Sequence, residues 1–508
     1  MWQRLRCGKN ETNILLLTVL FSCVFSFFGT SGAMQFGLGP DTSLDCDVTI
    51  TYGAGFRVSD RDEDLLTINT DDANRNFDQW DMINNKLTVF ADIDLKHKNF
   101  GLFVRPKAFY DHVYMTDNAN DSPETNNALV GGIINSSDEW AEKIEDIHGR
   151  NAEILDLFGY LSFNLSGRDI DLRVGKQVIS WGESLMISGG ISSAQSPTDA
   201  SAAVAVGTEV KEIYMPTESV YLQVGITPNL GLSGYYQWKW EKSRLMEGGT
   251  FFSQADMLDE IKAPSLTEVG SSIYAIRRGE DNEARDDGQY GVALTYILPW
   301  FNDTEVGVYY INYHSKSPLL LMGRSGGRTV LYSSFIEDIK LYGASVSSII
   351  GVANVSGEFS YRQDIGFRGS DAVGRPVEEI ADYWQAQVST IYMKALKYFA
   401  ESVTLTGEVG CGKEVDREEN EFAWKYAIRA GFDWYQVLPL LDITMNLAYS
   451  DVPEGTNLIG SEDTASASIG FNFTYKNKLS ANITYENRLK ENAYEDRDTI
   501  ALKLSYGF

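Results

Sequence analysis

Hydrophobic and polar side chains alternate one by one along most of the chain after about residue 45, in segments of about ten residues. The last segment has one face of Ile500, Leu502, Leu504, Tyr506 and Phe508 and another of Thr499, Ala501, Lys503 and Ser505. A repeat of two residues indicates a β-strand, because successive side chains of a strand point to opposite faces. Strands of this length and alternation are typical of a transmembrane β-barrel, with lipid outside and a lumen inside.

The lengths of the connections favour a barrel over a soluble sandwich, whose strands also alternate. Short turns are predicted at 96–98, 166–168, 227–229, 299–303, 437–440 and 476–478. Long polar connections occupy the alternate joints, at about 59–83, 116–150, 180–217, 242–286, 315–337, 365–379, 412–420, 451–462 and 489–497. Bacterial outer-membrane barrels alternate short periplasmic turns with long extracellular loops. The sequence therefore predicts an all-β, transmembrane antiparallel β-barrel of about 16–18 strands.

The N-terminus is predicted to be a secretory signal peptide. Arg4, Arg6 and Lys9 precede an apolar run at 14–28, and small residues follow up to Ala33. The run is shorter than the roughly 20 residues that a membrane-spanning helix needs. We expect residues 1–33 to be removed and residues 34–508 to form a single barrel domain in the Gram-negative outer membrane. A lipoprotein cut before Cys23 is a minor alternative.

At the C-terminus the alternation continues to the last residue. Leu502, Leu504, Tyr506 and Phe508 are interpreted as the signal that the barrel-assembly machinery reads before it inserts the chain into outer-membrane lipid. Together with the predicted signal peptide, this ending favours a membrane-insertion signal over a C-terminal phenylalanine that occurs by chance in a soluble protein.

The charge excludes one class of partner. The chain has a formal net charge of -28, and removal of residues 1–33, with three basic side chains and Glu11, makes it -30. Nucleic acid would be repelled by such a chain unless basic residues were gathered in a stripe, and the sequence has none. Acidic residues on predicted lumen faces, among them Asp92, Asp94 and Asp442, predict a preference for cations if the barrel conducts ions.

The sequence contains no recognisable motif of an enzyme active site. The four histidines, His97, His112, His148 and His314, fall in different segments, and no Gly-x-Ser-x-Gly elbow, Walker loop or His-Glu-x-x-His motif is present. Asp60, Asp62 and Asp64 have the spacing of a Ca²⁺ loop, but Leu65 stands where such a loop requires glycine. The stretch is interpreted as a solvated acidic loop. We predict no catalytic residues, metal or cofactor.

The most informative stretch runs from Arg173 to Ile191, a strand that leads into a glycine-rich loop with Trp181-Gly182-Glu183 at its centre. With the segments 51–62 and 355–362, it resembles the domain-of-unknown-function 1302 family of proteobacterial outer-membrane proteins. The resemblance implies a porin-like barrel of unassigned substrate, suspected of handling hydrophobic or aromatic compounds with an inner-membrane efflux partner. Residues 192–197 depart from the Asn-Pro-containing turn expected of the family.

The connection at 181–216 is too long and too apolar to extend freely into water, and we predict that it folds into the lumen as a constriction. Its charged residues are predicted to face the wall and form an eyelet that sets selectivity. The predicted constriction residues are Arg173, Gln177, Trp181, Glu183, Asp199, Glu209 and Lys211. An equally weighted alternative is a buried pair of Glu183 and Arg173 that pins the loop, with Trp181 as packing. Both readings can hold together.

The favoured function is a passive or ligand-gated outer-membrane channel for small, possibly hydrophobic or aromatic, molecules rather than an enzyme. Two alternatives stay open. One is an outer-membrane barrel enzyme of the lipase or protease kind, which needs Ser or Asp near a His at one rim. The other is a secreted β-rich ligand-binding protein without membrane contact.

Overall fold

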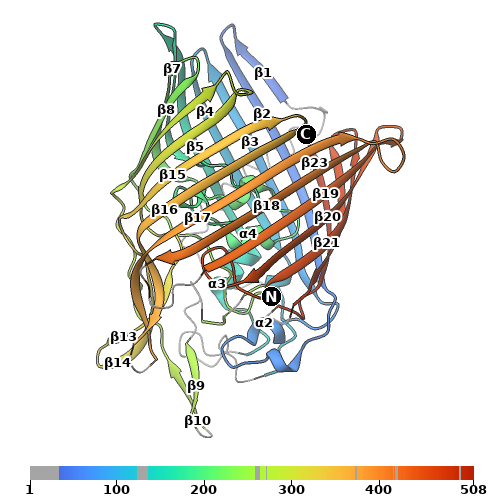
Figure 1. Cartoon of the computed structure of the whole chain (residues 1–508). Coiled ribbons are helices and arrows are strands. Elements are labelled where there is room, and N and C mark those ends of the chain that lie inside the picture. The colour runs from blue at the N-terminus through green and yellow to red at the C-terminus, as the bar shows by residue number, and fades with distance from the viewer. Residues whose placement is uncertain are drawn as a thin grey trace.

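Antiparallel strands form a wall that closes on itself (Figure 1). The computed structural model describes residues 34–508 apart from 123–135, 254, 258–263, 270–271, 372–373, 416, 418–421 and 491–493, so the predicted signal peptide lies outside the described residues. Across this described part, eighteen strands form the wall, and β23 (Thr499–Gly507) pairs with β2 (Thr42–Arg57) to close it. The other wall strands are β3 (Met82–His97), β4 (Phe100–Asp111), β5 (Arg150–Leu165), β6 (Arg168–Gln177), β7 (Thr217–Thr227), β8 (Leu230–Gln237), β11 (Gln289–Leu298), β12 (Thr304–Tyr313), β15 (Ile339–Ile350), β16 (Ala353–Ser370), β17 (Pro376–Ala395), β18 (Ser402–Val415), β19 (Phe422–Leu438), β20 (Leu441–Glu454), β21 (Ala465–Tyr475) and β22 (Leu479–Arg488).

The strands are joined alternately by short turns and long connections. Only Ser166 and Gly167 separate β5 from β6, and both have positive φ, 55° and 82°, as a two-residue hairpin turn requires. The next connection, between β6 and β7, spans 178–216. The predicted all-β antiparallel barrel of about 16–18 strands is therefore confirmed.

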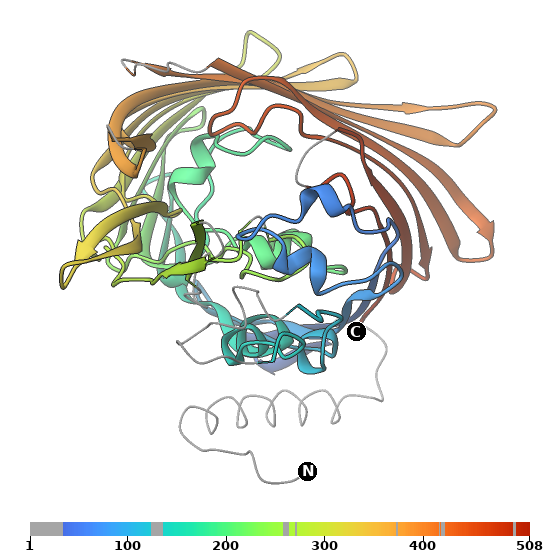
Figure 2. The same cartoon turned by 90° about the horizontal axis from the view of Figure 1, so that it is seen from below.

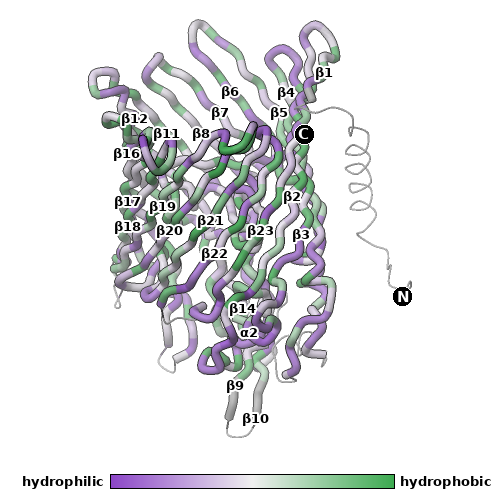
Figure 3. Tube along the Cα trace, turned by 90° about the vertical axis from the view of Figure 1, so that its right-hand side faces the viewer, coloured by the Kyte–Doolittle hydropathy of each residue, from purple (hydrophilic) through white to green (hydrophobic). Residues whose placement is uncertain are grey.

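The two faces of the wall differ as the alternation requires. On β23, Leu502 and Leu504 are 44% and 47% exposed on the outer face, whereas the inward Ser505 is only 8% exposed. The Ser505 hydroxyl oxygen lies 2.9 Å from that of Thr51, across the closing pair of strands. Figure 3 shows hydrophobic and hydrophilic positions alternating along strands such as β21, β22 and β23.

The C-terminal residues lie on the closing strand. The backbone N–H of Phe508 donates to the carbonyl of Val48 on β2 at 2.9 Å. The rings of Tyr506 and Phe508 pack edge to face with centroids 4.8 Å apart. The predicted insertion signal thus belongs to the strand that completes the barrel.

Several smaller elements do not belong to this wall. β1 (Met34–Gly39) pairs with the first residues of β2, at the opposite end of the barrel from the hairpins and α2 (Figure 1). The long connections hold two hairpins, short α-helices, three 3-10 turns and a π turn in the described residues: β9 (Ser265–Val269) with β10 (Ser272–Ile276), β13 (Leu319–Ser325) with β14 (Arg328–Ser334), α2 (Asp72–Arg75), α3 (Glu142–Ile144), α4 (Ala200–Val204), α5 (Val210–Ile213), η1 (Glu63–Leu65), η2 (Val113–Met115), η5 (Ile191–Ala194) and η4 (Glu145–Gly149). None of the described helices is long and apolar enough to cross a membrane.

Leu504→Arg tests which face of β23 meets lipid. An arginine on the lipid face costs about 2–4 kcal/mol at the bilayer midplane and less near the interfaces. We expect a lower urea midpoint for unfolding from lipid vesicles, followed by tryptophan fluorescence. Asn482→Arg, on the inner face of β22, is the matched control and should leave the midpoint nearly unchanged. Equal losses in both variants would contradict this assignment of faces.

Candidate functional site

The connection between β6 and β7 lies inside the barrel, and we call residues 178–216 the lumen segment. Figure 2, seen from the end that carries the long loops, shows it in green within the ring of strands. Its first half, up to about residue 193, contacts the inner faces of β16, β17 and β18, and its second half contacts β2, β3 and β4. In the closed wall, β19 to β23 lie between β18 and β2. The segment therefore crosses the lumen.

Two glutamates of the wall hold the first half through its backbone. The Glu408 carboxylate on β18 accepts hydrogen bonds from the consecutive N–H groups of Leu185, Met186 and Ile187, the last at 2.7 Å. Glu358 on β16 accepts from the N–H of Glu183 at 2.6 Å and of Ile191 at 2.9 Å. These N–H groups have no strand or helix to pair with, so the carboxylates supply their acceptors.

Donors from the same wall reach the carbonyl groups of this stretch. The Arg362 guanidinium donates to the carbonyl oxygens of Gly189 and Gly190, and Gln385 donates from Nε2 to that of Ser188 at 2.9 Å. Close packing explains the absence of side chains here, since a Cβ on Gly190 would lie 2.2 Å from Oε1 of Glu358. Side chains of β16 to β18 therefore form hydrogen bonds with both the N–H and the C=O groups of residues 183–191.

Apolar packing fixes the start of the lumen segment against the adjoining part of the inner wall, from β7 to β17. Ile179 and Ile191 are buried in one cluster with tyrosines of β7, β8, β12 and β17. The indole of Trp181 packs against Tyr235 and Tyr309, with ring centroids 5.1 and 6.0 Å away. The Trp181 indole is thus packed between the segment and two tyrosines of the wall.

The second half begins at a buried charge network. Asp199 caps α4 by accepting from the N–H of Ala202 at 2.9 Å. Its other oxygen lies 3.2 Å from Arg244, which also binds Glu153 of β5 at 2.6 Å. Burial raises the pKa of Asp199, but Arg244 and the hydrogen-bond donors outweigh it, so the pKa lies below its ordinary value. Asp199 therefore stays ionised and anchors the segment.

Beyond α4, the segment rests on a glycine pair of β2. A Cβ at Gly53 would lie 2.3 Å from the carbonyl oxygen of Val206, and one at Gly55 would lie 3.0 Å from the Val206 side chain. Only glycine allows this close approach of two backbones. The stretch 51–62, which resembles a family segment in sequence, thus contains the two glycines on which the lumen segment packs.

Charged residues fasten the last part to β3 and β4. Lys211 lies 3.2 Å from Asp92 and 3.4 Å from Glu209, with its ammonium 4.0 Å from the ring centroid of Phe90. Glu212 and Lys107 form an ion pair of 2.9 Å in which both side chains are 4% exposed. Lys211 therefore lies between Asp92 of the wall and Glu209 of the segment.

The other predicted site residues lie elsewhere. Arg173 stacks over Tyr221 at 4.5 Å and forms no ion pair with Glu183 among the described residues, so the proposed buried pair of these two is not what pins the loop. Gln177 is fully buried and donates to the carbonyl of Ser219 at 3.1 Å. Glu183 lies on the β16 side, where burial and the charges of Glu305 and Glu358 raise its pKa. The structure thus divides the predicted residues between opposite walls.

A cavity of about 170 Å³ remains between the lumen segment and the strands β22 and β23. One side is apolar and the other polar. The lining residues are Ile83, Val204, Val206, Gly207, Phe252, Asn482, Thr484, Glu486, Thr499, Ala501 and Lys503. Glu486 pairs with Arg488 at 3.0 Å, while Lys503 makes no ion pair with any described residue. The cavity beside the lumen segment therefore has one apolar side and one polar side. Among the described residues, no ion pair balances the charge of Lys503 in its lining.

Sequence reasoning missed Glu358, Arg362 and Glu408. The segment 355–362 was singled out only as family-like, although alternation places Glu358 and Arg362 on the same inward face. Two charged residues among the inward positions of one strand, with Ser356 and Ser360 at the others, are a signal for a polar partner inside. Nothing in the sequence near Glu408 indicated that its partner is a loop more than 200 residues away.

The sequence and the fold were compared with those of known proteins. A family model described as "Protein of unknown function (DUF1302)" matches residues 14–508. No curated protein sequence matches the chain. Solved structures with a similar fold include three outer-membrane proteins. OccAB3 of Acinetobacter baumannii is 13% identical with a TM-score of 0.45, over 92% of this chain and 99% of that one. OccK2 (OpdF) of Pseudomonas aeruginosa in complex with glucuronate is 10% identical with a TM-score of 0.42, over 92% and 98%. OpdK of the same organism with vanillate is 10% identical with a TM-score of 0.44, over 93% and 100%.

Glu408→Gln tests the hydrogen bonds that hold the backbone of residues 185–187. The amide has a single acceptor oxygen, and its NH₂ group faces N–H donors, so the hydrogen bonds to residues 185–187 weaken. A hydrogen bond to a charged acceptor contributes about 1.5–3 kcal/mol, so exchange protection of these amides should fall about ten-fold or more. The measurement is hydrogen–deuterium exchange by mass spectrometry, with the exposed Glu454→Gln as control. Unchanged protection in Glu408→Gln would show that packing alone holds the stretch.

Proposed function

The chain belongs to the family of proteins of unknown function DUF1302, and from this premise we propose that it is a channel that passes small molecules across a Gram-negative outer membrane. A closed barrel is the form in which strands can span lipid with every backbone group paired. The proposal includes export by the predicted signal peptide and insertion through Leu502, Leu504, Tyr506 and Phe508.

The observation that carries the proposal is the lumen segment itself. It is tied to both sides of the inner wall by ion pairs and backbone hydrogen bonds, yet it leaves a cavity beside β22 and β23. A barrel whose only task was anchorage would have no need for a narrowed, two-faced opening. A fixed constriction with polar groups on one side and apolar groups on the other is what selective passage requires.

The enzyme alternative gains no support from the histidines. Both ring nitrogens of His314 contact backbone atoms, of Asp287 and Asp338. His148 is packed against Tyr114, with ring centroids 5.2 Å apart. His97 meets the hydroxyl of Thr42 in the exposed turn region. In the described part of the chain, no histidine is placed between a nucleophile and an orienting carboxylate.

Removal of the crossing part of the segment tests the proposal. In a variant with Gly-Gly in place of residues 200–208, α4 and the Val206 contact with Gly53 are lost, while Asp199 and Glu212 remain as anchors. We expect single-channel conductance in planar bilayers to rise above that of the wild type, because one side of the constriction is gone.

A Gly-Gly insertion at the exposed turn between Gly326 and Gly327 is the control and should leave conductance unchanged. Equal steps in the deletion variant and the wild type would show that the segment does not limit passage. Folded, heat-modifiable protein that stays silent in both forms would overturn the channel proposal.

Charge selectivity gives a second test, and it revises the expected cation preference. Asp92 and Asp94 are paired with Arg105 and Lys96 at 2.6 and 3.1 Å, so their fields are largely cancelled. Lys503 is unpaired beside the cavity. We expect Lys503→Gln to shift the reversal potential in a KCl gradient toward cation permeation, while Lys476→Gln, in the exposed turn between β21 and β22, has no effect. A shift of the same size in both variants would mean that Lys503 does not line the path.

A further inference from the structure

Two long loops meet over the end of the barrel that carries α2. The loop between β2 and β3 contributes Asn76, whose side chain donates to the carbonyl of Gly249 at 2.9 Å in the loop between β8 and β11. The N–H of Asp256 donates to the carbonyl of Asn69 at 2.9 Å. Phe77 packs edge to face on Phe251, with centroids 5.4 Å apart. These contacts join loops whose roots are separated in the wall by β4 to β7.

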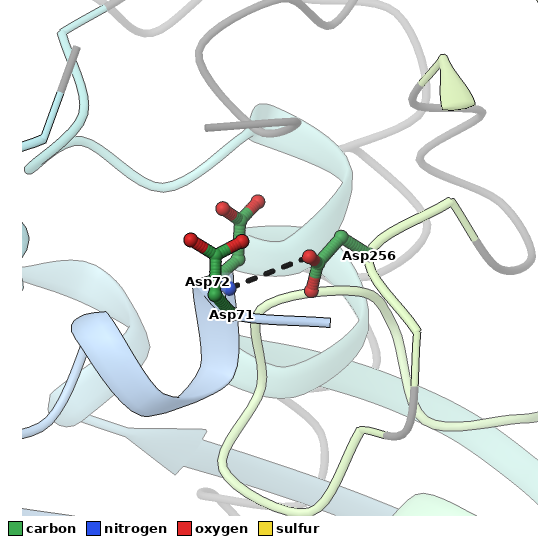
Figure 4. Close-up of side chains that lie close together, drawn as sticks. All are labelled: Asp71, Asp72 and Asp256. Atoms are coloured by element: carbon green, nitrogen blue, oxygen red, sulfur yellow. Dashed lines mark hydrogen bonds between the residues drawn. The ribbon is translucent and has the colours of Figure 1, made fainter. Parts of the chain in front are cut away.

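Three carboxylates converge where the loops touch. Asp71 and Asp72 stand at the start of α2, and Asp256 comes from the other loop (Figure 4). One ligand atom from each lies within 4.8 Å of those of the other two. The side chains are buried, with 5%, 0% and 0% exposure in that order. This is a set of buried oxygen donors.

Asp256 provides the independent indication of a ligand. It is wholly buried and faces the two aspartates of α2 (Figure 4). Among the described residues, its Oδ1 has no hydrogen-bond partner, and its Oδ2 accepts a single long bond of 3.4 Å from the N–H of Asp72, within the cluster itself. A buried carboxylate oxygen without a donor is costly unless something else compensates it.

The neighbouring cations are engaged elsewhere. Arg75 pairs with Oδ2 of Asp71 at 2.5 Å, which leaves Oδ1 of Asp71 buried and without a partner. Arg497 donates to the carbonyls of Phe251 and Ser253 at 2.6 and 2.9 Å and forms no ion pair with Asp256. Burial and the charges of Asp72 and Asp71 raise the pKa of Asp256 well above its ordinary value. Positive charge is therefore in deficit at this point.

We propose that Asp71, Asp72 and Asp256 form a Ca²⁺ site that fastens the loop between β2 and β3 to the loop between β8 and β11. Calcium takes six to eight oxygen ligands at roughly 2.3–2.6 Å, so donors up to about 5 Å apart can share one ion. The three carboxylate oxygens meet this condition, and backbone carbonyls and water complete the shell. The absence of His and Cys from the cluster disfavours zinc.

The test uses the full mature chain in detergent and isothermal titration with CaCl₂ after chelation. We expect one site in the wild type, at least ten-fold weaker binding in Asp256→Asn, and unchanged binding in the exposed control Asp64→Asn. Ca²⁺ should also increase exchange protection in residues 69–76 and 250–256 of the wild type but not of Asp256→Asn. Heat-modifiable migration confirms that each variant is folded, and the isosteric Asp71→Asn serves as a second variant.

Absence of Ca²⁺ binding to the wild type at millimolar concentration would overturn the proposal and leave a shared proton as the compensation. Equal Ca²⁺ binding by the wild type and Asp256→Asn would also overturn it, because the ion would then sit elsewhere. Equal binding of MgCl₂ would contradict the assignment to calcium. None of these results depends on conductance, so the site and the channel proposal fail or stand separately.

Discussion

The structure depends on the need of every backbone N–H and C=O group for a partner where water is scarce. In the wall, strand pairing meets this need, and the pairing of β23 with β2 removes the last free edges. Inside the barrel, the lumen segment has no strand to pair with over residues 183–193. Side chains of β16 to β18 take over that task, with Glu358 and Glu408 as acceptors and Arg362 and Gln385 as donors. One constraint thus shapes both the barrel and its constriction.

The same constraint explains which residues are charged on the inner wall. Glu408 accepts from three consecutive N–H groups, and Glu358 accepts from those of Glu183 and Ile191. Several N–H donors stabilise a carboxylate inside the barrel. Further along the segment, ion pairs do the fastening, from Asp199 with Arg244 to Glu212 with Lys107. Charges that face the open cavity are few by comparison. In the proposed channel, the charge balance of the passage depends on positions such as Lys503 rather than on the acidic composition of the whole chain.

Two levels of organisation follow from these contacts. The wall and the lumen segment form a connected unit, since the segment touches strands on both sides of the lumen. The loops at the far end are joined to one another by aromatic packing at Phe77 and Phe251 and by buried polar groups around α2. They are also tied to the lumen segment, because Arg244 of the loop between β8 and β11 pairs with Asp199. A cation between Asp71, Asp72 and Asp256 would act on these loops. Because Arg244 and Phe252 belong to the loop between β8 and β11, the same loop also borders the lumen segment and the cavity.

The sequence by itself determined the barrel, because a repeat of two residues and the alternation of short and long connections depend only on local geometry and on the lipid outside. Leu502, Leu504 and the turn at Ser166 and Gly167 were readable in this way. The inward path of residues 181–216 was also indicated, since its apolar residues need cover. Tertiary structure alone decided the partners. Glu408 meets residues 185–187, Arg173 meets Tyr221 rather than Glu183, and Asp256 meets Asp71 and Asp72 only because closure of the wall brings distant segments together. Such contacts leave no period or spacing in the sequence.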